Sequence, residues 1–480
     1  MQEVIIAKRI PTLALILLAC SPSSPNSSVN DGQDSGVPAN PDAATRDAGT
    51  VDGGSPPATV PNILLLIADD LGADVAPCMA VEPNRVPMPA IEALCDRGLL
   101  FTKTWANPMC SPSRATLLTG RYGFRTGVGQ LVRGDESPAL PLTETTLPNL
   151  LKANSGAPYA TAAFGKWHVA NNSNGGSQHP HTSGFDAYAG LMTGAHRDYY
   201  SWSRTENGET QTVDDYSTTR IADDAIGWLG QQTQPWFLWL AFTAPHTPLH
   251  APPDHLHSQG NLPGNRRHIQ QNGSRYYGAA SEALDREIGR VLAAIGDDQL
   301  ANTWVIFVGD NGTPGQVVPE PRTRDRAKST LYEGGIHVPL VIAGPGITAP
   351  GSRIDALVNL TDLHRTIAEL AGRDSATVDH DRLVDSVSLL PYFDNANAPS
   401  QRDWIYSEFF GPTIDSSRAG RTIRSTRYKV IRFDEGARAL YDLESDPYEQ
   451  DNLLDGTLDD ATQATYDELD GALIDLSGRP

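Results

Sequence analysis

Short apolar segments alternate with amphipathic helical segments along most of this chain, and this alternation constrains the fold more than any other feature of the sequence. Strands are expected at residues 62–68, 159–164, 236–242, 303–308 and 338–343. Helices are expected at residues 90–97, 216–232, 274–295 and 361–371. Strands that alternate with helices form a mostly parallel sheet with helices on both faces. The pattern therefore predicts a large α/β domain, which we place at residues 61–390.

A smaller α+β subdomain is expected over residues 391–480. Strand candidates at 404–409 and 428–433 predict a short antiparallel sheet there. Residues 442–475 hold twelve acidic side chains and no Lys or Arg, so this acidic tail carries much of the formal net charge of −21. Nucleic-acid binding requires a basic surface. The charge therefore argues against a nucleic-acid partner.

The first 60 residues predict export. Lys8 and Arg9 precede an apolar run at residues 13–19 that is too short to remain as a membrane-spanning helix. The run ends in Leu17-Leu18-Ala19-Cys20, which resembles a bacterial lipoprotein signal, with Cys20 as the lipidated residue; an ordinary signal peptide is the alternative. Residues 1–20 are thus expected to be a signal peptide, and residues 21–60, rich in Ser, Pro, Asp and Gly, predict a flexible tether. We expect a protein of the bacterial periplasm or cell surface, held to the membrane only by its lipid.

Polar clusters follow four of the expected strands, each where the strand ends. In chain order they are Asp69-Asp70, Gly165-Lys166-Trp167-His168, Pro245-His246-Thr247-Pro248 and Asp310-Asn311-Gly312. Any one cluster alone fits a helix cap, a turn or a structural histidine equally well. Ligands bind beyond the carboxyl ends of the strands in an open α/β sheet. The four clusters together therefore predict one site.

The residue types in these clusters indicate the chemistry. Four side chains offer only oxygen ligands, which suit Ca²⁺ or Mg²⁺ rather than Zn²⁺: Asp69, Asp70, Asp310 and Asn311. Lysine ammonium groups bind anions and histidines transfer protons near neutral pH; the candidates are Lys166, Lys328, His168 and His246. This set predicts hydrolysis of an oxyanion ester, and phosphate and sulfate esters both fit it.

One segment decides between the two esters. Cys110-Ser111-Pro112-Ser113-Arg114, followed by a short expected helix and by Thr119-Gly120-Arg121, resembles the signature of the type I sulfatases of the alkaline phosphatase superfamily. The other clusters match that family in order, with Lys328 upstream of Glu333-Gly334-Gly335. The resemblance covers residues 61–455. It implies an alkaline phosphatase-like fold and hydrolysis of the sulfate ester of a sugar or aryl alcohol.

The resemblance also implies a role for each site residue. A maturation enzyme would oxidise Cys110 to formylglycine, whose hydrate is the nucleophile, with Arg114 orienting it. Ca²⁺, or alternatively Mg²⁺, would be bound by Asp69, Asp70, Asp310, Asn311 and the oxygen at position 110, and Asp310 would also take the proton of the attacking hydroxyl. Lys166, Lys328 and His246 would bind the sulfate. His246 and Lys328 would protonate the leaving oxygen, and His168 would deprotonate the second hydroxyl.

The substrate is less constrained. Residues 184–190 and 196–200 resemble the arylsulfatase B-like branch, whose members desulfate amino sugars. A sugar pocket or plain surface loops would then contain Trp202, His250, His255, His257, Arg266 and Arg267. A sulfated carbohydrate is the preferred substrate and an aryl sulfate the next.

Two further points stay open. With Cys20 and Cys110 assigned, Cys78 and Cys95 remain, and they form either a disulfide or two free thiols. The function has two alternatives: a phosphodiesterase or phosphonate monoester hydrolase of the same superfamily, and a catalytically silent lipoprotein that binds sulfated glycans.

Overall fold

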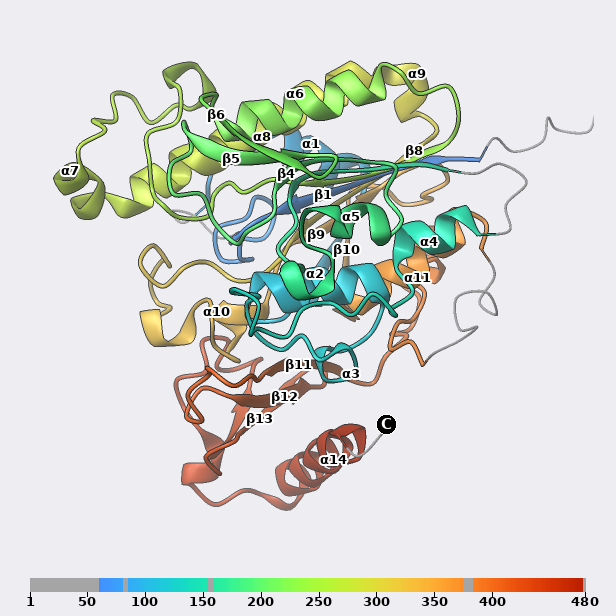
Figure 1. The fold of residues 1–480 in the computed structure, drawn as a ribbon. Helices are drawn as coiled ribbons and strands as arrows, with labels where there is room; N and C mark the ends of the chain where they lie inside the picture. Colours follow the sequence, from blue (N-terminus) through green and yellow to red (C-terminus); the bar gives the residue numbers. More distant parts are fainter. Residues whose placement is uncertain (1–59, 81–84, 154–158, 374–382, 478–480) are drawn as a thin grey trace, which may run out of the picture. The chain divides into compact units, whose positions relative to one another are not determined.

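The computed structural model describes residues 60–80, 85–153, 159–373 and 383–477 (Figure 1). The predicted signal peptide (1–20), its Cys20, and all of the predicted tether except Val60 lie outside these residues. Within the described part of the chain, no helix combines the length and apolar character needed to cross a membrane.

A ten-stranded sheet forms the large domain, with the strand order β10-β2-β9-β8-β1-β7-β3-β4-β5-β6. The pairs β10-β2, β8-β1, β1-β7, β7-β3 and β3-β4 are parallel. This confirms the predicted mostly parallel α/β fold. The strands are β1 (Asn62–Ala68), β2 (Leu99–Trp105), β3 (Ala160–Lys166), β4 (Ala187–Leu191), β5 (Trp202–Glu206), β6 (Glu209–Val213), β7 (Trp236–Ala241), β8 (Thr303–Gly309), β9 (Leu340–Ala343) and β10 (Ser352–Asn359).

Alternate side chains of the central strands enter two different cores. In β1, Ile63, Leu65 and Ile67 belong to the core on one face, whereas Leu64 and Leu66 belong to the core on the other. A strand buried on both faces needs a continuous apolar run, which is why β1 reads Asn-Ile-Leu-Leu-Leu-Ile-Ala.

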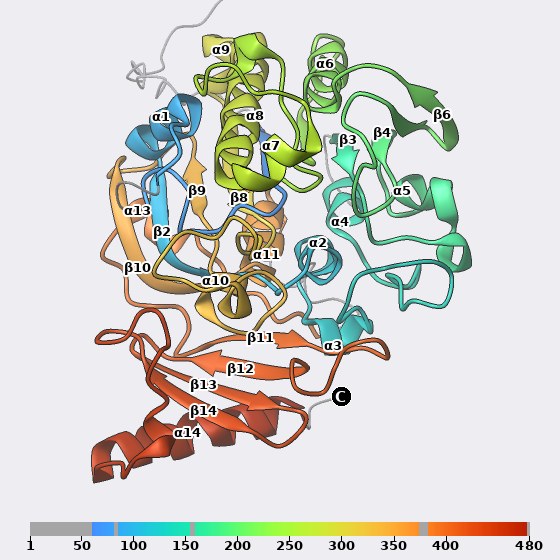
Figure 2. The same ribbon diagram turned by 90° about the vertical axis from the view of Figure 1, so that its left-hand side faces the viewer.

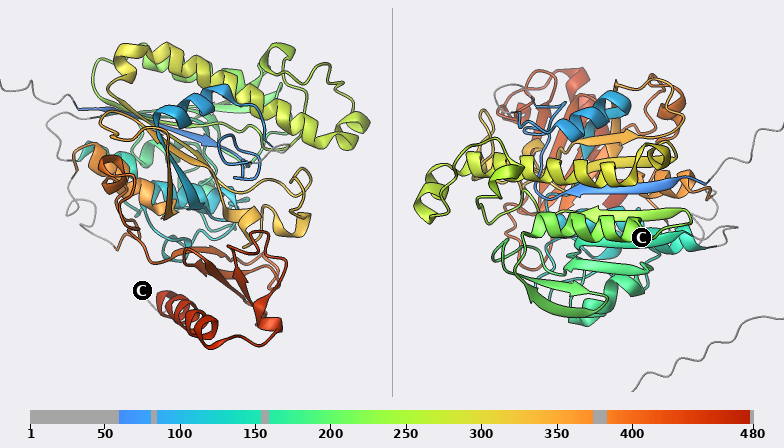
Figure 3. Two further views of the ribbon diagram at one scale, coloured as in Figure 1. Left: turned by 180° about the vertical axis from the view of Figure 1, so that it is seen from behind. Right: turned by 90° about the horizontal axis from the view of Figure 1, so that it is seen from above.

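Helices cover both faces of this sheet (Figures 1 and 3). One layer consists of α1 (Pro89–Arg97), α6 (Ser217–Leu229), α8 (Gly273–Ile295) and α9 (Asp297–Leu300). The other layer consists of α2 (Cys110–Thr119), α4 (Leu147–Lys152), α5 (His179–Thr182) and α11 (Thr361–Leu370). Shorter helices are α3 (Gly123–Thr126), α7 (Arg266–Gln271), α10 (Glu333–Ile336) and α13 (Pro391–Asp394), and the 3-10 helices are η1 (Asn172–Asn174), η2 (Gly176–Gln178), η3 (Asp254–Leu256), η4 (Arg324–Arg326) and η5 (Leu453–Asp455).

A separate antiparallel sheet and one helix form the C-terminal subdomain. Its strands, in spatial order, are β11 (Ile405–Phe409), β12 (Gly420–Arg424), β13 (Tyr428–Phe433) and β14 (Arg438–Asp442). One face packs Phe409 and Ile431 against Leu331 of the large domain. The opposite face packs against α14 (Asp460–Ser477), which lies on the far side of the sheet from the large domain (Figure 2). Most of this acidic helix therefore lies away from the large domain, and only its last turn reaches it, where Leu476 packs with Tyr122 and Tyr406.

Buried charges join the small sheet to the large domain. Lys429 Nζ of β13 lies 2.7 Å from Glu449 Oε1 and 3.3 Å from Glu333 Oε1, and Arg424 Nη1 lies 3.2 Å from Glu333 Oε2. Trp105 Nε1 of β2 also donates a hydrogen bond to Glu333 Oε1, at 2.9 Å. Burial alone would raise the pKa of Glu333, but Lys429 and Arg424 lower it to about 2. Glu333 therefore stays ionised while buried.

A second buried acid lies at the same interface. Glu408 of β11 accepts hydrogen bonds from the Phe124 backbone N–H in α3 at 2.7 Å and from the Tyr406 hydroxyl at 2.9 Å. Its side chain is buried. Burial raises the pKa of Glu408 to about 7, because desolvation disfavours the charged form.

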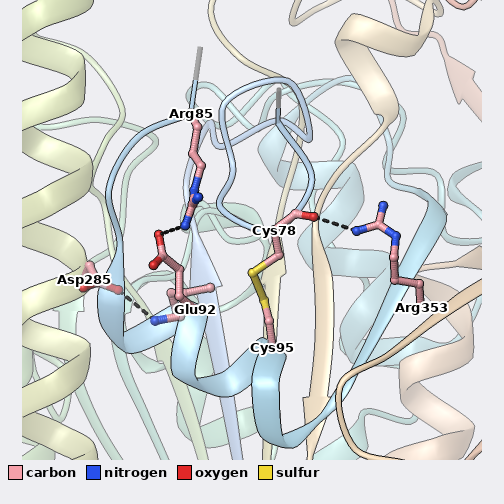
Figure 4. The surroundings of a disulfide bond; sticks show 7 residues. Cys78, Arg85, Glu92, Cys95, Asp285 and Arg353 are labelled. Carbon is pink, nitrogen blue, oxygen red and sulfur yellow. Dashed lines mark hydrogen bonds and ion pairs between the residues drawn. A yellow bond between two sulfur atoms is a disulfide. The ribbon is translucent and has the colours of Figure 1, made fainter. Parts of the chain in front are cut away.

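A disulfide joins the loop after β1 to α1 (Figure 4). It links Cys78 to Cys95, which is one of the two alternatives that the sequence leaves open. Arg353 Nη1 donates to the Cys78 carbonyl at 2.8 Å. The first backbone N–H groups of α1 donate to the Asp285 carboxylate of α8, at 3.0 and 2.9 Å. Because these N–H groups have no partner within their own helix, the carboxylate acts as the cap of α1.

We predict that Lys429→Met lowers the free energy of unfolding by about 3–5 kcal/mol, because it leaves two carboxylates buried without their ammonium partner. Urea denaturation at pH 7 measures this loss. The matched control is Lys152→Met, which removes a partly exposed ion pair with Asp186 and is expected to cost less than about 1 kcal/mol. Equal losses in the two variants would contradict the structural role given to Lys429.

The raised pKa of Glu408 predicts that the stability of the protein depends on pH. Its folded-state pKa lies above the ordinary value of 4.5, so between pH 4.5 and about 7 the folded chain keeps a proton that the unfolded chain has released. The free energy of unfolding therefore falls as the pH rises through this window, by roughly 3 kcal/mol in total from this residue. Below the window, Glu408 is protonated in both states and causes no such loss. We expect Glu408→Gln to show a smaller loss of unfolding free energy between pH 5 and pH 7.5 than wild type.

The matched control for this prediction is Glu435→Gln, at an exposed position. Its pH dependence is expected to equal that of the wild type. A Glu408→Gln protein with the wild-type slope would show that Glu408 does not titrate in this range.

Candidate active site

The four polar clusters predicted from the sequence meet at one edge of the large sheet. They follow β8, β1, β7 and β3, which are consecutive strands in the sheet. All four strands are parallel to their neighbours in this set, so their carboxyl ends lie side by side.

The backbone turns sharply where two of these strands end. Asp70 and His168 both adopt left-handed conformations, with φ of 70° and 59°. Asp70 is held by its own N–H, which donates to Asp310 Oδ1 at 3.2 Å, and by its carbonyl, which accepts from the Tyr277 hydroxyl at 2.7 Å. Such conformations are costly for residues other than glycine and concentrate at functional sites.

Oxygen atoms gather at the centre of this edge. Asp69, Asp70, Asp310 and Asn311 are all buried. Asn311 Nδ2 donates to Asp70 Oδ1 at 2.7 Å, while the buried Asn311 Oδ1 has no hydrogen-bond donor among the described residues. Burial and the neighbouring Asp69 raise the pKa of Asp310. A donor set of three carboxylates and one amide oxygen fits a hard divalent cation such as Ca²⁺.

Cys110 lies at the start of α2, against this oxygen cluster. Its Sγ is 3.2 Å from Asp69 Oδ1 and 3.7 Å from Lys328 Nζ, and ligand atoms of Asp69, Asp70, Cys110 and His246 lie within 4.8 Å of one another. Burial, followed by the charges of Asp310 and Asp69, raises the pKa of the Cys110 thiol. A cysteine acts as a nucleophile through its thiolate, so this environment does not suit an unmodified Cys110 in that role.

Arg114 ties α2 to the oxygen cluster. It lies four residues after Cys110 on α2, so the two side chains share one helix face. Its Nε and Nη2 atoms donate to Asp310 Oδ2 at 3.0 and 2.9 Å, and Nη1 donates to the Lys166 carbonyl at 2.6 Å. The guanidinium has no solvent exposure. It therefore fixes the position of the Asp310 carboxylate.

Three further side chains place basic groups around the cluster. Lys166 Nζ lies 2.5 Å from Asp69 Oδ2, Lys328 forms an ion pair with Asp70, and His246 Nε2 lies 3.6 Å from Asp70 Oδ2. Burial would raise the pKa of Asp70, but His246, Lys328 and Lys166 outweigh it and lower that pKa to about 2. Asp70 is therefore ionised at neutral pH.

Both histidines of the site are neutral near pH 7. Burial lowers the pKa of His246 to about 3, and its Nδ1 lies 2.6 Å from the Thr247 carbonyl, which accepts only, so Nδ1 carries the proton. Burial, then the charges of Lys166 and Arg114, lower the pKa of His168 well below its ordinary value. His168 Nδ1 has no hydrogen-bond partner among the described residues. Its ring packs on Gly194, where a Cβ would lie 2.3 Å from Cε1.

The structure therefore brings the predicted core set together, comprising Asp69, Asp70, Cys110, Arg114, Lys166, His168, His246, Asp310, Asn311 and Lys328. The predicted sugar-pocket residues are scattered. Trp202 lines a cavity of about 730 Å³. His250 instead stacks on Tyr199, with ring centroids 3.8 Å apart. A second cavity adjoins Lys328 and is described below. Neither cavity is lined by His255, His257, Arg266 or Arg267.

Several residues near the site are absent from the sequence prediction. A cavity of about 790 Å³ adjoins Asp70 and Lys328, and Arg324 and Arg418 line it. Tyr199 donates from its hydroxyl to the His246 carbonyl at 2.7 Å, a supporting role like that of Tyr277 at Asp70. Arg324 and Arg418 lie in no short motif, so only their placement in the fold shows them. Tyr199 lies in the 196–200 stretch that the sequence analysis singles out, but its contact with His246 is visible only in the structure.

Comparison with known proteins identifies the family. Residues 61–373 match the family described as Sulfatase, and residues 325–477 match the family described as N-sulphoglucosamine sulphohydrolase, C-terminal. The uncharacterized sulfatase YdeN of Escherichia coli (strain K12) is 29% identical, with 82% of each chain covered. The N-acetylgalactosamine-6-sulfatase of Homo sapiens is 31% identical, and the match covers 69% of this chain but 65% of that relative.

Solved structures give the same result. The structure of Ps i-CgsB in complex with k-i-k-neocarrahexaose has 26% sequence identity and a TM-score of 0.74, covering 88% of this chain and 93% of the other. The fold, the order of the motifs and the match to more than half of the chain agree. The chain therefore belongs to the sulfatase family of the alkaline phosphatase superfamily, and it is a sulfuric ester hydrolase.

Proposed function

We propose that this sulfatase hydrolyses a sulfate ester of a sugar, with formylglycine at position 110 and a bound Ca²⁺ ion. The observation that carries the proposal is the position of Cys110, buried between three carboxylates and the Lys328 ammonium. That environment keeps a thiol protonated and unreactive, and it offers a hard cation its preferred ligands.

The oxygen cluster would hold the cation. Asp69, Asp70, Asp310 and Asn311 would supply the protein ligands, and the unpartnered Asn311 Oδ1 is a buried acceptor that a cation would satisfy. When bound, Ca²⁺ lowers the cost of deprotonating a hydroxyl beside it and polarises a sulfate oxygen. Mg²⁺ is the alternative ion.

Position 110 would carry the nucleophile. Hydrated formylglycine supplies two hydroxyls on one carbon, one to attack sulfur and one whose deprotonation releases the sulfate. The residue begins α2, whose N-terminal N–H groups favour negative charge at that point. Arg114 would hold Asp310 in place, and the Asp310 carboxylate would accept the proton released by the attacking group.

The basic side chains would bind and release the substrate. Lys166 and Lys328 would place two positive charges on the sulfate. His246, neutral in its present surroundings, would gain a proton more readily beside a bound sulfate, because a nearby negative charge favours the charged form. His246 and Lys328 would then protonate the leaving oxygen. Neutral His168, with its free Nδ1, is suited to accept the last proton.

A sugar sulfate is the proposed substrate class. Relatives of comparable similarity carry the names N-acetylgalactosamine-6-sulfatase and steryl-sulfatase, so the names alone do not decide the class. The structural neighbour that binds a hexaose matches this chain over 88% of its length. The acidic helix α14 packs on the outer face of the small sheet, so the sheet lies between most of its charges and the large domain. An aryl sulfate is the second choice.

The proposal includes the cellular location. An exported, lipid-anchored enzyme of the periplasm or cell surface is consistent with the sequence of residues 1–60, which lie outside the described part of the chain except Val60. A maturation enzyme that converts Cys110 would be its partner.

We predict an aldehyde at position 110 in protein made in its native host. Mass spectrometry of the tryptic peptide spanning residues 104–114 measures it directly. Cys110→Ala is expected to lower kcat/KM for a sulfate ester on the order of a thousandfold or more, because the nucleophile is lost. The control is the wild-type sequence expressed without a maturation enzyme, which should fold but remain inactive.

An unconverted Cys110 in active protein would contradict the mechanism. Higher activity on a phosphate diester than on any sulfate ester would favour the phosphodiesterase alternative. Conversion without turnover of any ester would favour the silent glycan-binding alternative.

We also predict that Ca²⁺ stabilises the folded protein. At a free concentration about 100 times its dissociation constant, a ligand that binds only the folded state adds about 2.7 kcal/mol. Chelation should therefore lower both Tm and activity, and added Ca²⁺ should restore them. Asp310→Asn should abolish the Ca²⁺-dependent rise in Tm, whereas Asp403→Asn, at an exposed position, should retain it. An unchanged Tm in wild type after chelation and re-addition would contradict a Ca²⁺ site.

A further inference from the structure

The cavity beside Lys328 is lined in part by residues that have no role in the proposed chemistry. Asp70, which is buried, and Lys328, whose side chain is partly exposed, are its members from the catalytic cluster. Its exposed members include Arg324 of η4 and Arg418 of the loop between β11 and β12. The large domain and the C-terminal sheet thus both contribute to one cavity that opens from the catalytic cluster.

Arg324 carries a charge without a partner. No hydrogen bond or ion pair joins its guanidinium to any described residue. Its stem packs on Gly315, where a Cβ would lie 2.7 Å from Arg324 Cγ. Gly315 therefore allows the close approach of Arg324 to the cavity wall.

Arg418 lines the same cavity. Its Nη2 donates to the Ser329 carbonyl at 2.5 Å, directly after Lys328 in the chain. No described carboxylate lies within ion-pair distance of it. Its guanidinium therefore supports the loop that carries Lys328 and still has donors left for a ligand.

The acidic side chains of the cavity do not cancel these charges. Asp70 is already paired with Lys328. Asp325 lies next to Arg324 in η4 and is exposed. Beyond the catalytic cluster, the lining thus has two guanidinium groups and one carboxylate. The cavity of about 730 Å³ near Trp202 differs, because Arg197 and Asp135 offset each other there.

We propose that Arg324 and Arg418 form a subsite for a second anionic group, a sulfate or a carboxylate, on the sugar whose sulfate ester is hydrolysed. This inference rests on the proposed function, because it concerns the same substrate. A guanidinium binds a planar carboxylate or a sulfate through two parallel N–H groups. The half-buried rings of Tyr332 and Phe433 supply apolar surface for the sugar between the two anionic groups. The enzyme would then prefer disulfated saccharides over monosulfated ones.

Kinetics on matched substrates tests this preference. The substrates are sulfated hexosamines and sulfated galactoses. Each sugar is tested in a monosulfated and in a disulfated form. The specificity ratio is kcat/KM for the disulfated sugar divided by kcat/KM for its monosulfated form, taken for the pair on which wild type is most active. Arg324→Gln should lower this ratio about tenfold, because it removes one charge-assisted hydrogen bond. Arg324→Lys should recover part of the ratio because it keeps the charge. Raising the salt concentration should also lower the wild-type ratio.

The matched control is Arg286→Gln, at an exposed position of α8 outside both cavities, which should leave the ratio unchanged. Arg418→Gln is a second variant, but it also removes the bond to the Ser329 carbonyl. For this variant, the contribution of the subsite is therefore measured by the ratio of the KM values for the two sugars, rather than by kcat. A wild-type enzyme without preference for any disulfated sugar, or an equal loss on both members of a pair in Arg324→Gln, would overturn the proposal.

A binding measurement separates this inference from the proposed function. Calorimetric titration of Cys110→Ala protein with the same sugar pairs needs no turnover. Tighter binding of the disulfated sugars, lost when Arg324→Gln is added, would support the subsite even if no sulfate ester were hydrolysed. Turnover of sulfate esters without this difference in binding would leave the proposed function standing and reject the subsite.

Discussion

Three carboxylates buried at one point of the sheet edge are the constraint on which the rest of the site depends. Asp69, Asp70 and Asp310 come from two neighbouring strands, and each has almost no contact with solvent. An unpaired buried charge costs several kcal/mol, so each needs a fixed compensating charge. Lys166, Lys328 and Arg114 supply it, at Asp69, Asp70 and Asp310 respectively.

These ion pairs differ in how tightly they hold the side chains of the site. Arg114 and Asp310 are locked together, with two hydrogen bonds and no exposure. Lys328 is less confined, because its side chain retains 13% exposure and also faces Cys110. Burial, and then the charges of Asp310 and Asp69, raise the pKa of the Cys110 thiol, and carboxylate oxygens are the ligands that a hard divalent cation prefers. The environment that makes a thiol unreactive is therefore the one that suits an oxygen nucleophile beside a metal ion.

Sequence patterns predict the centre of this fold better than its edges. β1, β7 and β8 are continuous apolar runs because both of their faces are buried. β5 and β6 escape prediction because they are antiparallel, mostly polar and partly exposed. The apolar pattern predicts β9 as a strand, but its direction, antiparallel to both β2 and β8, depends on the path of the chain and not on its own residues. In the same way, the motifs predict the residues around Cys110, whereas Arg324 and Arg418 meet only through tertiary structure.

The C-terminal sheet links stability to substrate recognition. Lys429, Glu333 and Glu449 fix it to the large domain through buried charges, and Arg418 extends from the same sheet to the cavity beside Lys328. A change that loosens this interface therefore moves a binding group as well as a packed surface. The net charge of the chain gives no guide to this region, because the part of the acidic tail that forms α14 packs on the opposite face of the sheet. An acidic protein can thus present a locally basic cavity to an anionic substrate, since exposed charges farther apart than about 8–10 Å are largely screened at physiological salt.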